Sequence, residues 1–550
     1  MNLAARHFNI YEYFLSDERM ARTGRNPAIE FRGRSFTYEQ LRQEADLCAS
    51  RFADHGVRRG DRVLMLLNDS PEFVAFFLAS AAIGAIAVPV NTFLSADDVG
   101  LIVRDCDPKL VVVESELLGR LKSPAAAGRS IINLDSDERP CLTEEKEIAP
   151  SPETAGTDED SPAFILYTSG STGRPKGVLH RHGAIRATVD TYARTVLRLA
   201  EADRVYSAPR MFFAYGLGNS LSFPLAAGGT TILHTERATP AFVSSVLEDQ
   251  RPTVFFGVPA LFGALIQIRG AAGRTESQDP RDGPDPGPPA SDSGRPEEAG
   301  ASKPGDPGGG RLLQLDGLRM CVSAGEALPG KIFEDWKRET GLSILDGIGS
   351  TEMLHIFISN RADDTRPDCS GRVVDGYEAR LLDEAGHDIA EGQTGNLWVR
   401  GPSSTGGYWN MPDLSAEVIK GGWVRTGDLY RRDSYGYLYQ LGRSDDCFKV
   451  KGLWVSPIEV ESVLLSHELV TEAAVVPDFD ASGLATAHAF VVIREEKDRE
   501  GVAEALLNYA AARLPGHKVP SQIDFVEALP RTATGKVQRF KLRQQTGTEG

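Results

Sequence analysis

The chain has 550 residues, which is too many for one hydrophobic core, so at least two domains are expected. Hydrophobic residues make up 41% and charged residues 25%, as in soluble globular proteins. The formal net charge of −17 argues against nucleic acid or an anionic membrane as the main partner. No apolar run has the length of a membrane span or the layout of a secretory signal, and we expect a cytoplasmic protein.

The first 270 residues predict alternating strands and helices. A capping box at 37–40 begins a helix, and an apolar run at 62–67 is typical of a buried strand. A Ser-Pro pair begins a second helix at 70–83, and further strands are expected at 85–90 and 109–113. This alternation indicates parallel sheets covered by helices.

A strand at 163–167 is followed by a loop of glycines and hydroxyl side chains and then, we predict, by a helix at 184–199. Small residues let backbone amides approach an anion closely, and Lys176 adds a positive charge. The loop lacks the Lys-Ser/Thr pair of a Walker loop and the GxGxxG pattern of a dinucleotide loop. We interpret it as another kind of phosphate-binding loop, rather than as a flexible surface loop.

Residues 270–310 consist largely of Gly, Pro, Asp, Ser and Glu, and the sequence predicts a disordered surface insertion there. After it, 318–329 and 344–353 each predict a strand that ends in small or polar residues. In doubly wound sheets such strand ends gather on one side, so these segments could share a site with the phosphate loop. Short strands with tight turns between 395 and 443 indicate a separate β-rich subdomain.

Four single residues have candidate roles in chemistry on a nucleotide. Glu352 could bind Mg²⁺ together with phosphates, and Asp428 could accept hydrogen bonds from ribose hydroxyls. Arg443 could contact ribose or phosphate, and Lys536 lies in a glycine-containing turn. Taken alone, each is more often a solvated side chain or an ordinary turn residue.

Seven segments, in order, resemble motifs of the adenylate-forming superfamily, which comprises acyl- and aryl-CoA synthetases, luciferases and peptide-synthetase adenylation domains. They are 167–180, 323–329, 346–352, 426–428, 442–446, 449–452 and 530–537. The resemblance implies an α/β fold with a large N-terminal domain, 1–444, of stacked αβα sheets plus a β-rich subdomain. A small mobile α+β C-terminal domain, 445–550, would carry the catalytic lysine. ATP, Mg²⁺ and coenzyme A are the implied cofactors.

The resemblance also assigns residues. Lys536 would contact carboxylate and α-phosphate oxygens during adenylation, and Glu352 and Arg443 are the other catalytic candidates. Thr168 and Glu352 would serve the metal, Asp445 would be the hinge, and the Gly452 loop would line the thioester-forming pocket after the small domain rotates. The nucleotide-binding residues would be Thr168, Ser169, Gly170, Ser171, Thr172, Gly173, Lys176, Ser323, Gly325, Glu326, Ala327, Asp346, Gly347, Ser350, Thr351, Asp428 and Gly452.

The segment 211–219 has three aromatic side chains among small residues, which by itself fits ordinary core as well as a ligand pocket. Together with 322–329 and 347–357 it resembles benzoate-CoA ligases, and the similarity covers nearly the whole chain apart from the insertion. It implies a short aromatic pocket in which a flat ring lies against Gly349, because no side chain intrudes there. The implied pocket residues are Ala214, Tyr215, Gly349, His355 and Ile356.

The sequence is therefore interpreted as an aryl-CoA synthetase of the benzoate-CoA ligase type, which makes benzoyl-AMP from ATP and then transfers the acyl group to coenzyme A. Two alternatives stay open: an aryl-adenylating enzyme that loads a carrier protein, and a non-catalytic sensor of acyl-AMP or ATP. The expected partners are a small aromatic acid, ATP and coenzyme A, with no nucleic acid and no membrane. A monomer or a homodimer is expected.

Overall fold

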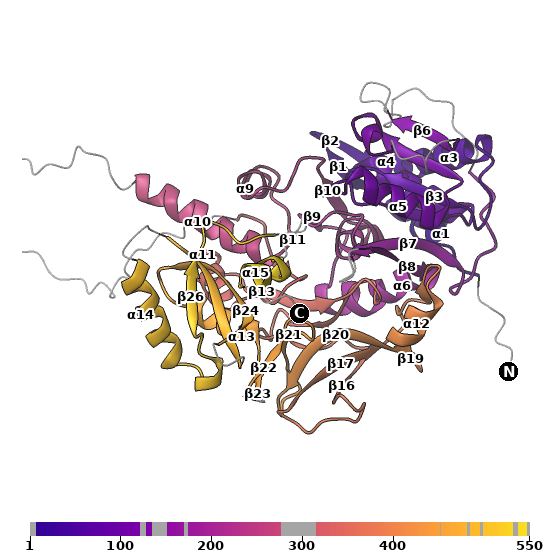
Figure 1. Ribbon diagram of the computed structural model, residues 1–550. Coiled ribbons are helices and arrows are strands. Elements are labelled where there is room, and N and C mark those ends of the chain that lie inside the picture. Colours follow the sequence, from indigo (N-terminus) through magenta and orange to yellow (C-terminus); the bar gives the residue numbers. More distant parts are fainter. Residues whose placement is uncertain are drawn as a thin grey trace, which may run out of the picture.

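The computed structural model describes residues 7–121, 128–134, 151–169, 174–276, 315–451, 453–480, 484–494, 499–531 and 537–546 (Figure 1). The site predictions for Gly170, Ser171, Thr172, Gly173, Gly452 and Lys536 therefore lie outside the described residues. So does most of the insertion predicted at 270–310. Its predicted beginning is wrong, because helix α10 (Pro259–Glu276) continues six residues past Gly270. The alanines and charged residues at 271–276 are good helix formers and extend that helix.

A nine-stranded sheet forms one half of the large N-terminal part. Its central strands, from β13 to β1, are parallel, and antiparallel strands stand at both edges. The order is β15 (Arg372–Val373), β14 (Ile356–Ser359), β13 (Ile344–Gly349), β12 (Met320–Ser323), β11 (Val254–Gly257), β9 (Arg204–Ser207), β10 (Thr230–Leu233), β1 (Pro27–Phe31) and β2 (Arg34–Thr37).

A seven-stranded sheet forms the other half. It has the order β18 (Gly407–Tyr408), β8 (Pro175–Arg181), β7 (Pro162–Ser169), β4 (Ile86–Pro89), β3 (Arg62–Leu66), β5 (Leu110–Glu114) and β6 (Ser130–Leu134). Strands β7 and β8 pair antiparallel as a hairpin. The predicted passage from the phosphate loop directly into a helix is therefore wrong, because β8 comes between the loop and helix α6.

Helices separate and cover the two sheets. Every residue of α4 is buried, and one core cluster contains α4 together with residues from both sheets, so this helix lies between them. A second cluster packs α9, α10 and α11 on the outer face of the nine-stranded sheet, and a third packs α5 on the outer face of the seven-stranded sheet. The result is the stacked αβα arrangement that the sequence predicts.

Two helices of this part begin at their predicted caps: Thr37 forms the capping box of α3, and Ser70 caps α4, whose first residue is Pro71. The helices of this part, besides α10, are α1 (Ile10–Leu15), α2 (Asp17–Thr23), α3 (Tyr38–Asp54), α4 (Pro71–Ala82), α5 (Ala96–Cys106), α6 (His182–Thr188), α7 (Ala214–Leu217), α8 (Phe223–Ala227), α9 (Pro240–Asp249) and α11 (Gly330–Thr340). Helix α6 continues as a π-helix, η3 (Val189–Leu197), and a second π-helical turn, η4 (Gly218–Ser222), joins α7 to α8.

The β-rich subdomain is a five-stranded sheet, seen in orange in Figure 1. It consists of β16 (Glu378–Leu382), β17 (Thr394–Arg400), β20 (Trp423–Arg432), β19 (Ile419–Lys420) and β21 (Leu438–Arg443), with α12 (Pro412–Val418) beside it. Three of its strands were predicted from the sequence.

The C-terminal part has its own core, formed on both faces of a three-stranded sheet. The sheet has the order β24 (Val470–Phe479), β25 (Ala485–Ile493) and β26 (Gln522–Phe525). Helices α13 (Pro457–Leu465) and α14 (Arg499–Ala511) cover one face, α15 (Arg539–Gln545) covers the other, and the β22 (Phe448–Val450) and β23 (Leu453–Val455) pair precedes them. Separate cores are what a two-domain chain requires, whereas rotation about Asp445 stays a prediction.

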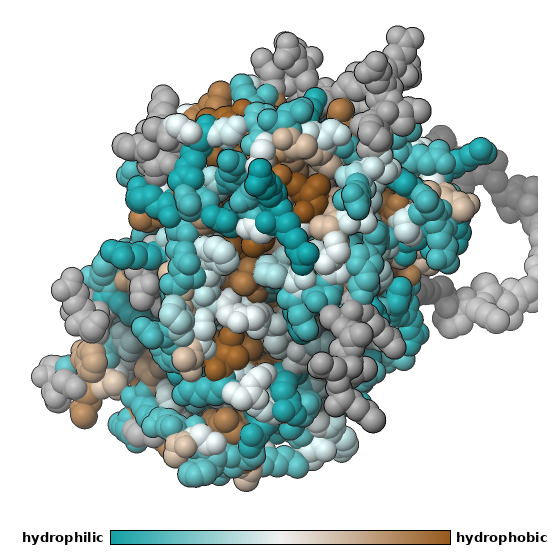
Figure 2. Space-filling model, turned by 90° about the vertical axis from the view of Figure 1, so that its right-hand side faces the viewer, coloured by the Kyte–Doolittle hydropathy of each residue, from teal (hydrophilic) through white to brown (hydrophobic). Residues whose placement is uncertain are grey.

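The face shown in Figure 2 is mainly hydrophilic, with hydrophobic residues in small separate patches. Among the described residues, no helix combines the length and the apolar composition that crossing a bilayer requires.

Candidate active site

The hairpin of β7 and β8 positions both predicted phosphate-side residues that the structure describes in full. Thr168 and Lys176 are paired across the two strands, on either side of the loop, and both are half-buried. A methyl group on Gly177 would lie 2.9 Å from Ile165 Cγ2, so only glycine allows β7, β8 and the segment around Trp409 to pack this closely. Ser169 ends β7 and therefore lies at the same end of the hairpin.

Glu352 is held beside this hairpin by a tyrosine that the sequence analysis missed. Strand β18, which contains Tyr408, pairs with β8, and the Tyr408 hydroxyl donates to Glu352 Oε1 at 2.7 Å. The backbone N–H of Thr405 donates to the Glu352 carbonyl at 2.8 Å. The Glu352 carboxylate is thus fixed in direction while it stays half-buried.

One strand of the hairpin, β8, contains a buried histidine, His180. The ring of His180, in β8, stacks on Phe164, with 5.0 Å between ring centroids. Burial lowers the pKa of His180 to about 3, although a hydrogen bond with the Thr351 backbone opposes the shift. His180 is therefore neutral.

The ends of β12 and β13 bring the predicted adenine-flanking residues together. Ser323 and Asp346 are partners in the parallel register and are both buried. Burial raises the pKa of Asp346 well above its ordinary value, against hydrogen bonds from the backbone of Gly347 and Leu328. After Ser323 the chain turns at Gly325, whose φ of +97° favours glycine, and leads through Glu326 and Ala327 to α11.

Asp428 and Arg443 face each other on β20 and β21. They are register partners, and Arg443 Nη1 lies 3.5 Å from Asp428 Oδ1 and donates to the Thr426 carbonyl at 2.7 Å. The Thr-Gly-Asp turn contains glycine because Gly427 has a φ of +76°, a left-handed conformation that favours glycine. Asp428 is buried whereas Arg443 is half-exposed, which leaves the arginine accessible to an anion.

The five predicted ring-pocket residues come from segments that contact one another, since Gly349 pairs with Ile356 and the His355 ring contacts the Tyr215 ring. We call the rings of Tyr192, Tyr215, Phe223 and His355 the aromatic cluster. His355 lies 5.4 Å from Tyr215 and 4.5 Å from Phe223, measured between ring centroids. The Tyr215 hydroxyl donates to the Val322 carbonyl at 3.3 Å, which connects the cluster to the end of β12. Ala214 is the neighbour of Tyr215 in α7, and Ile356 follows His355 in β14.

His355 is a neutral member of this cluster. Burial lowers its pKa to about 3. Its Nε2–H donates to Asn219 Oδ1 at 3.0 Å, and the Asn219 amide in turn donates to Ser207 Oγ at 3.2 Å. Asn219 was not predicted as a site residue, although it lies in the 211–219 segment that the sequence analysis singled out.

The pairing of two strands by itself requires glycine at position 349. A methyl group there would lie 2.7 Å from the backbone carbonyl of His355, so glycine is required for β13 to pair with β14. The prediction that this glycine leaves room for a flat ring stays a prediction. Gly218 is constrained more tightly, because its methyl group would lie 2.3 Å from His355 Cδ2.

The predicted hinge is joined to the last helix of the chain. Arg543, in α15, donates to the Asp445 carbonyl at 3.1 Å and to Asp446 Oδ1 at 2.6 Å. Arg539 of the same helix pairs with Glu461 at 2.8 Å. The segment that follows Lys536 is thus connected to the residues next to the hinge.

The described residues contain no group of three or more His, Cys, Asp or Glu that could hold a metal ion by themselves.

Two protein families and a benzoate–CoA ligase match this chain over most of its length. The family described as "AMP-binding enzyme" matches residues 16–409, and "AMP-binding enzyme C-terminal domain" matches residues 459–536. A benzoate–CoA ligase of Thauera aromatica is 39% identical over 536 residues, which cover 95% of this chain and 93% of that protein.

Two solved structures share the whole arrangement. The crystal structure of the anthranilate CoA ligase AuaEII in complex with anthranoyl-AMP has a TM-score of 0.85 and 33% identity, over 98% of this chain and 97% of the other. A benzoate CoA ligase from Burkholderia xenovorans LB400 has a TM-score of 0.82 and 38% identity, over 98% of this chain and 100% of the other.

Proposed function

Since the chain belongs to the family of AMP-binding enzymes, we propose that it is an AMP-forming benzoate-CoA ligase. The observation that carries the proposal is the position of the aromatic cluster, which meets the end of β12 through the Tyr215 hydroxyl and the Val322 carbonyl. Ser323, the next residue, is a predicted nucleotide contact. An aromatic acid and ATP would thus bind at the ends of the same strands, as attack of the carboxylate on the α-phosphorus requires.

The chemistry explains why the site needs both an acid pocket and a nucleotide-binding region. A carboxylate is a poor electrophile, and joining it to AMP supplies a good leaving group for the later attack of a thiol. In the first step a carboxylate oxygen attacks the α-phosphorus of ATP, and the bond to pyrophosphate breaks. Negative charge develops on the phosphates, and cations placed there in advance lower the barrier. Lys176, beside the phosphate loop, and Arg443, beside Asp428, are described cations that could serve this role, and Lys536 is assigned to the reacting oxygens by resemblance alone.

The described residues fit a magnesium ion on the phosphate side. The Glu352 carboxylate, oriented by Tyr408, and the Thr168 hydroxyl would hold it, and both offer the hard oxygen atoms that Mg²⁺ prefers. When bound, the ion would neutralise charge on the leaving pyrophosphate. Asp428 would accept the ribose hydroxyls, with Arg443 beside it.

Selectivity for an aryl acid would come from the aromatic cluster. His355 is neutral at physiological pH, so the wall it forms with Tyr215 offers ring edges and faces rather than a charge. Such a wall favours a flat apolar ring over a flexible chain. Coenzyme A would enter after the C-terminal part rotates about Asp445, because Lys536 has to leave before the thiol arrives.

A panel of acids tests the proposal. AMP formation that requires coenzyme A should be fastest with benzoate or a benzoate with a small substituent, and slow with cyclohexane carboxylate and short fatty acids. Equal rates across the panel would refute the aryl assignment. Transfer to a carrier protein with no use of free coenzyme A would favour the aryl-adenylating alternative, and no acid-dependent pyrophosphate release would favour a sensor.

A further inference from the structure

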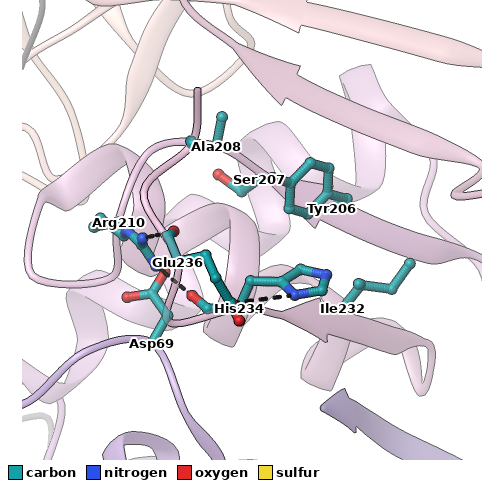
Figure 3. A pocket seen from close by; sticks show the side chains of 9 residues that line it. Asp69, Tyr206, Ser207, Ala208, Arg210, Ile232, His234 and Glu236 are labelled. Atoms are coloured by element: carbon teal, nitrogen blue, oxygen red, sulfur yellow. Dashed lines mark hydrogen bonds and ion pairs between the residues drawn. The ribbon is translucent and has the colours of Figure 1, made fainter. Parts of the chain in front are cut away.

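The turn that leads into the aromatic cluster is held by two buried charged residues, Asp69 and Arg210 (Figure 3). Asp69 lies in the loop between β3 and α4, and Arg210 follows β9; their side chains are 4% and 8% exposed. Asp69 Oδ1 accepts a hydrogen bond from the Met211 backbone N–H at 3.0 Å, and Asp69 Oδ2 lies 4.0 Å from Arg210 Nη1. The two residues line a small pocket of about 10 Å³.

The Arg210 guanidinium connects this turn to a third segment. It donates to three consecutive backbone carbonyls after β10, those of His234, Thr235 and Glu236, at 3.1 Å for Thr235. A planar guanidinium can serve several acceptors at once in a fixed geometry. The segments at 69, at 210–211 and at 234–236 are therefore tied together by one side-chain pair.

Helix α7 rests directly on this turn. The Phe213 N–H donates to the Arg210 carbonyl at 3.1 Å, and the Leu217 N–H donates to the Phe213 carbonyl at 2.8 Å. A methyl group on Gly216 would lie 2.0 Å from the Arg210 carbonyl oxygen, so the helix and the Arg210 backbone are in the closest possible contact. Any shift of Arg210 is passed to α7, which contains Ala214 and Tyr215.

Burying two charged side chains costs desolvation free energy, which their mutual attraction offsets only in part. Burial raises the pKa of Asp69 to about 6, although Arg210 and the Met211 N–H oppose the shift. An apolar pair of similar volume would often be at least as stable, so the charged pair does more for geometry than for stability.

We propose that Asp69 and Arg210 are positioning residues that fix α7 and so set the affinity for the aromatic acid, an inference that rests on the proposed function. They act through Met211 and Phe213 and do not touch the nucleotide side. The Michaelis constant for the acid should therefore depend on them, and the Michaelis constant for ATP should not.

The test compares Arg210→Met, Arg210→Lys and a matched control, Arg319→Met. Arg319 also pairs with a buried aspartate, Asp203, at 2.7 Å, and donates to backbone carbonyls, but it lies at the opposite end of β12 from the cluster. Arg210→Met should raise KM for benzoate about 10- to 100-fold, because a shift of about 1 Å can cost that much, and leave KM for ATP within about twofold. Arg210→Lys should recover part of the loss, since an ammonium retains three donors. Arg319→Met should leave both constants near those of the wild type.

Asp69→Asn serves if Arg210→Met does not fold. It retains an acceptor oxygen for Met211 and nearly the same volume, and it should raise KM for benzoate by a smaller factor, about 3- to 10-fold, again without a change for ATP. Equal changes in both constants, or none in either, would overturn the positioning role while the wild type stays active. A wild type inactive with every aromatic acid would overturn the proposed function instead.

Discussion

The aromatic cluster and the surroundings of Glu352 are neighbours in the fold but are built in opposite ways. The cluster consists of buried rings, with Gly218 and Gly349 in contacts too close for any other residue. Glu352, Thr168 and Lys176 are half-buried polar residues at strand ends, and Glu352 is directed by a single tyrosine hydroxyl. Substitutions in the cluster should therefore act through packing and change stability, whereas those near Glu352 should act through charge and spare stability.

The largest effect is expected from Glu352→Gln. Loss of the carboxylate removes the only described protein anion proposed for the metal, so kcat/KM for Mg-ATP should fall about 100-fold or more. The unfolding midpoint should stay close to that of the wild type. Pyrophosphate release at several Mg²⁺ concentrations measures the effect, with Glu378→Gln in the β-rich subdomain as a surface control. A large fall in stability would contradict the contrast between the two regions.

Gly218→Ala tests the packed region. The added methyl group would lie 2.3 Å from His355 Cδ2, and the surrounding rings leave the imidazole little freedom, so we expect a loss of about 1–3 kcal/mol in stability. Gly156→Ala is the matched control, because no described atom lies within 4 Å of its added methyl group. Thermal unfolding of both variants shows the difference, and equal midpoints would argue that the cluster is loosely packed.

Tyr408→Phe tests how far the orientation of Glu352 matters for the use of Mg-ATP. Without the hydroxyl the Glu352 carboxylate loses its 2.7 Å hydrogen bond, and KM for Mg-ATP should rise about 10-fold, as for other residues that orient a metal ligand. KM for benzoate should change little. Tyr435→Phe, a change at an exposed tyrosine, is the control. A rise in KM for benzoate alone would contradict this role and indicate that Tyr408 acts on the acid pocket.

The smallest effect concerns pH and His180. Its pKa is lowered to about 3 in the fold, from 6.5 for a free histidine, so the unfolded chain binds the extra proton between these values. Stability from this group is present above pH 6.5 and is lost as the pH falls. In His180→Phe, the unfolding free energy should fall less steeply below pH 6.5, by about 1.4 kcal/mol per pH unit, than in the wild type. Unfolding midpoints at pH 7 and pH 5 measure it, and parallel curves for variant and wild type would refute the assignment.

The sequence predicted what local pattern determines. The capped helices α3 and α4 and the parallel strands depend on residues close together in the chain, and the structure confirms them. It did not reveal β8, because the apolar residues of 175–181 follow a proline and a glycine and resemble a helix start as much as a strand.

Contacts between distant segments could not be predicted in this way. Tyr408 meets Glu352 across 56 residues, and Asp69 meets Met211 across 142, and no spacing rule connects such pairs. The reason for Gly349 was also hidden, since the His355 carbonyl that excludes a methyl group belongs to the next strand. A glycine beside a presumed site is equally well explained by a ligand and by a neighbouring backbone.

The most direct test of the account is exchange of labelled pyrophosphate into ATP in the absence of coenzyme A. We expect exchange that requires both benzoate and Mg²⁺ and proceeds without the thiol, because benzoyl-AMP and pyrophosphate form reversibly in the first step. Formation of benzoyl-CoA with no benzoate-dependent exchange before coenzyme A is added would contradict it.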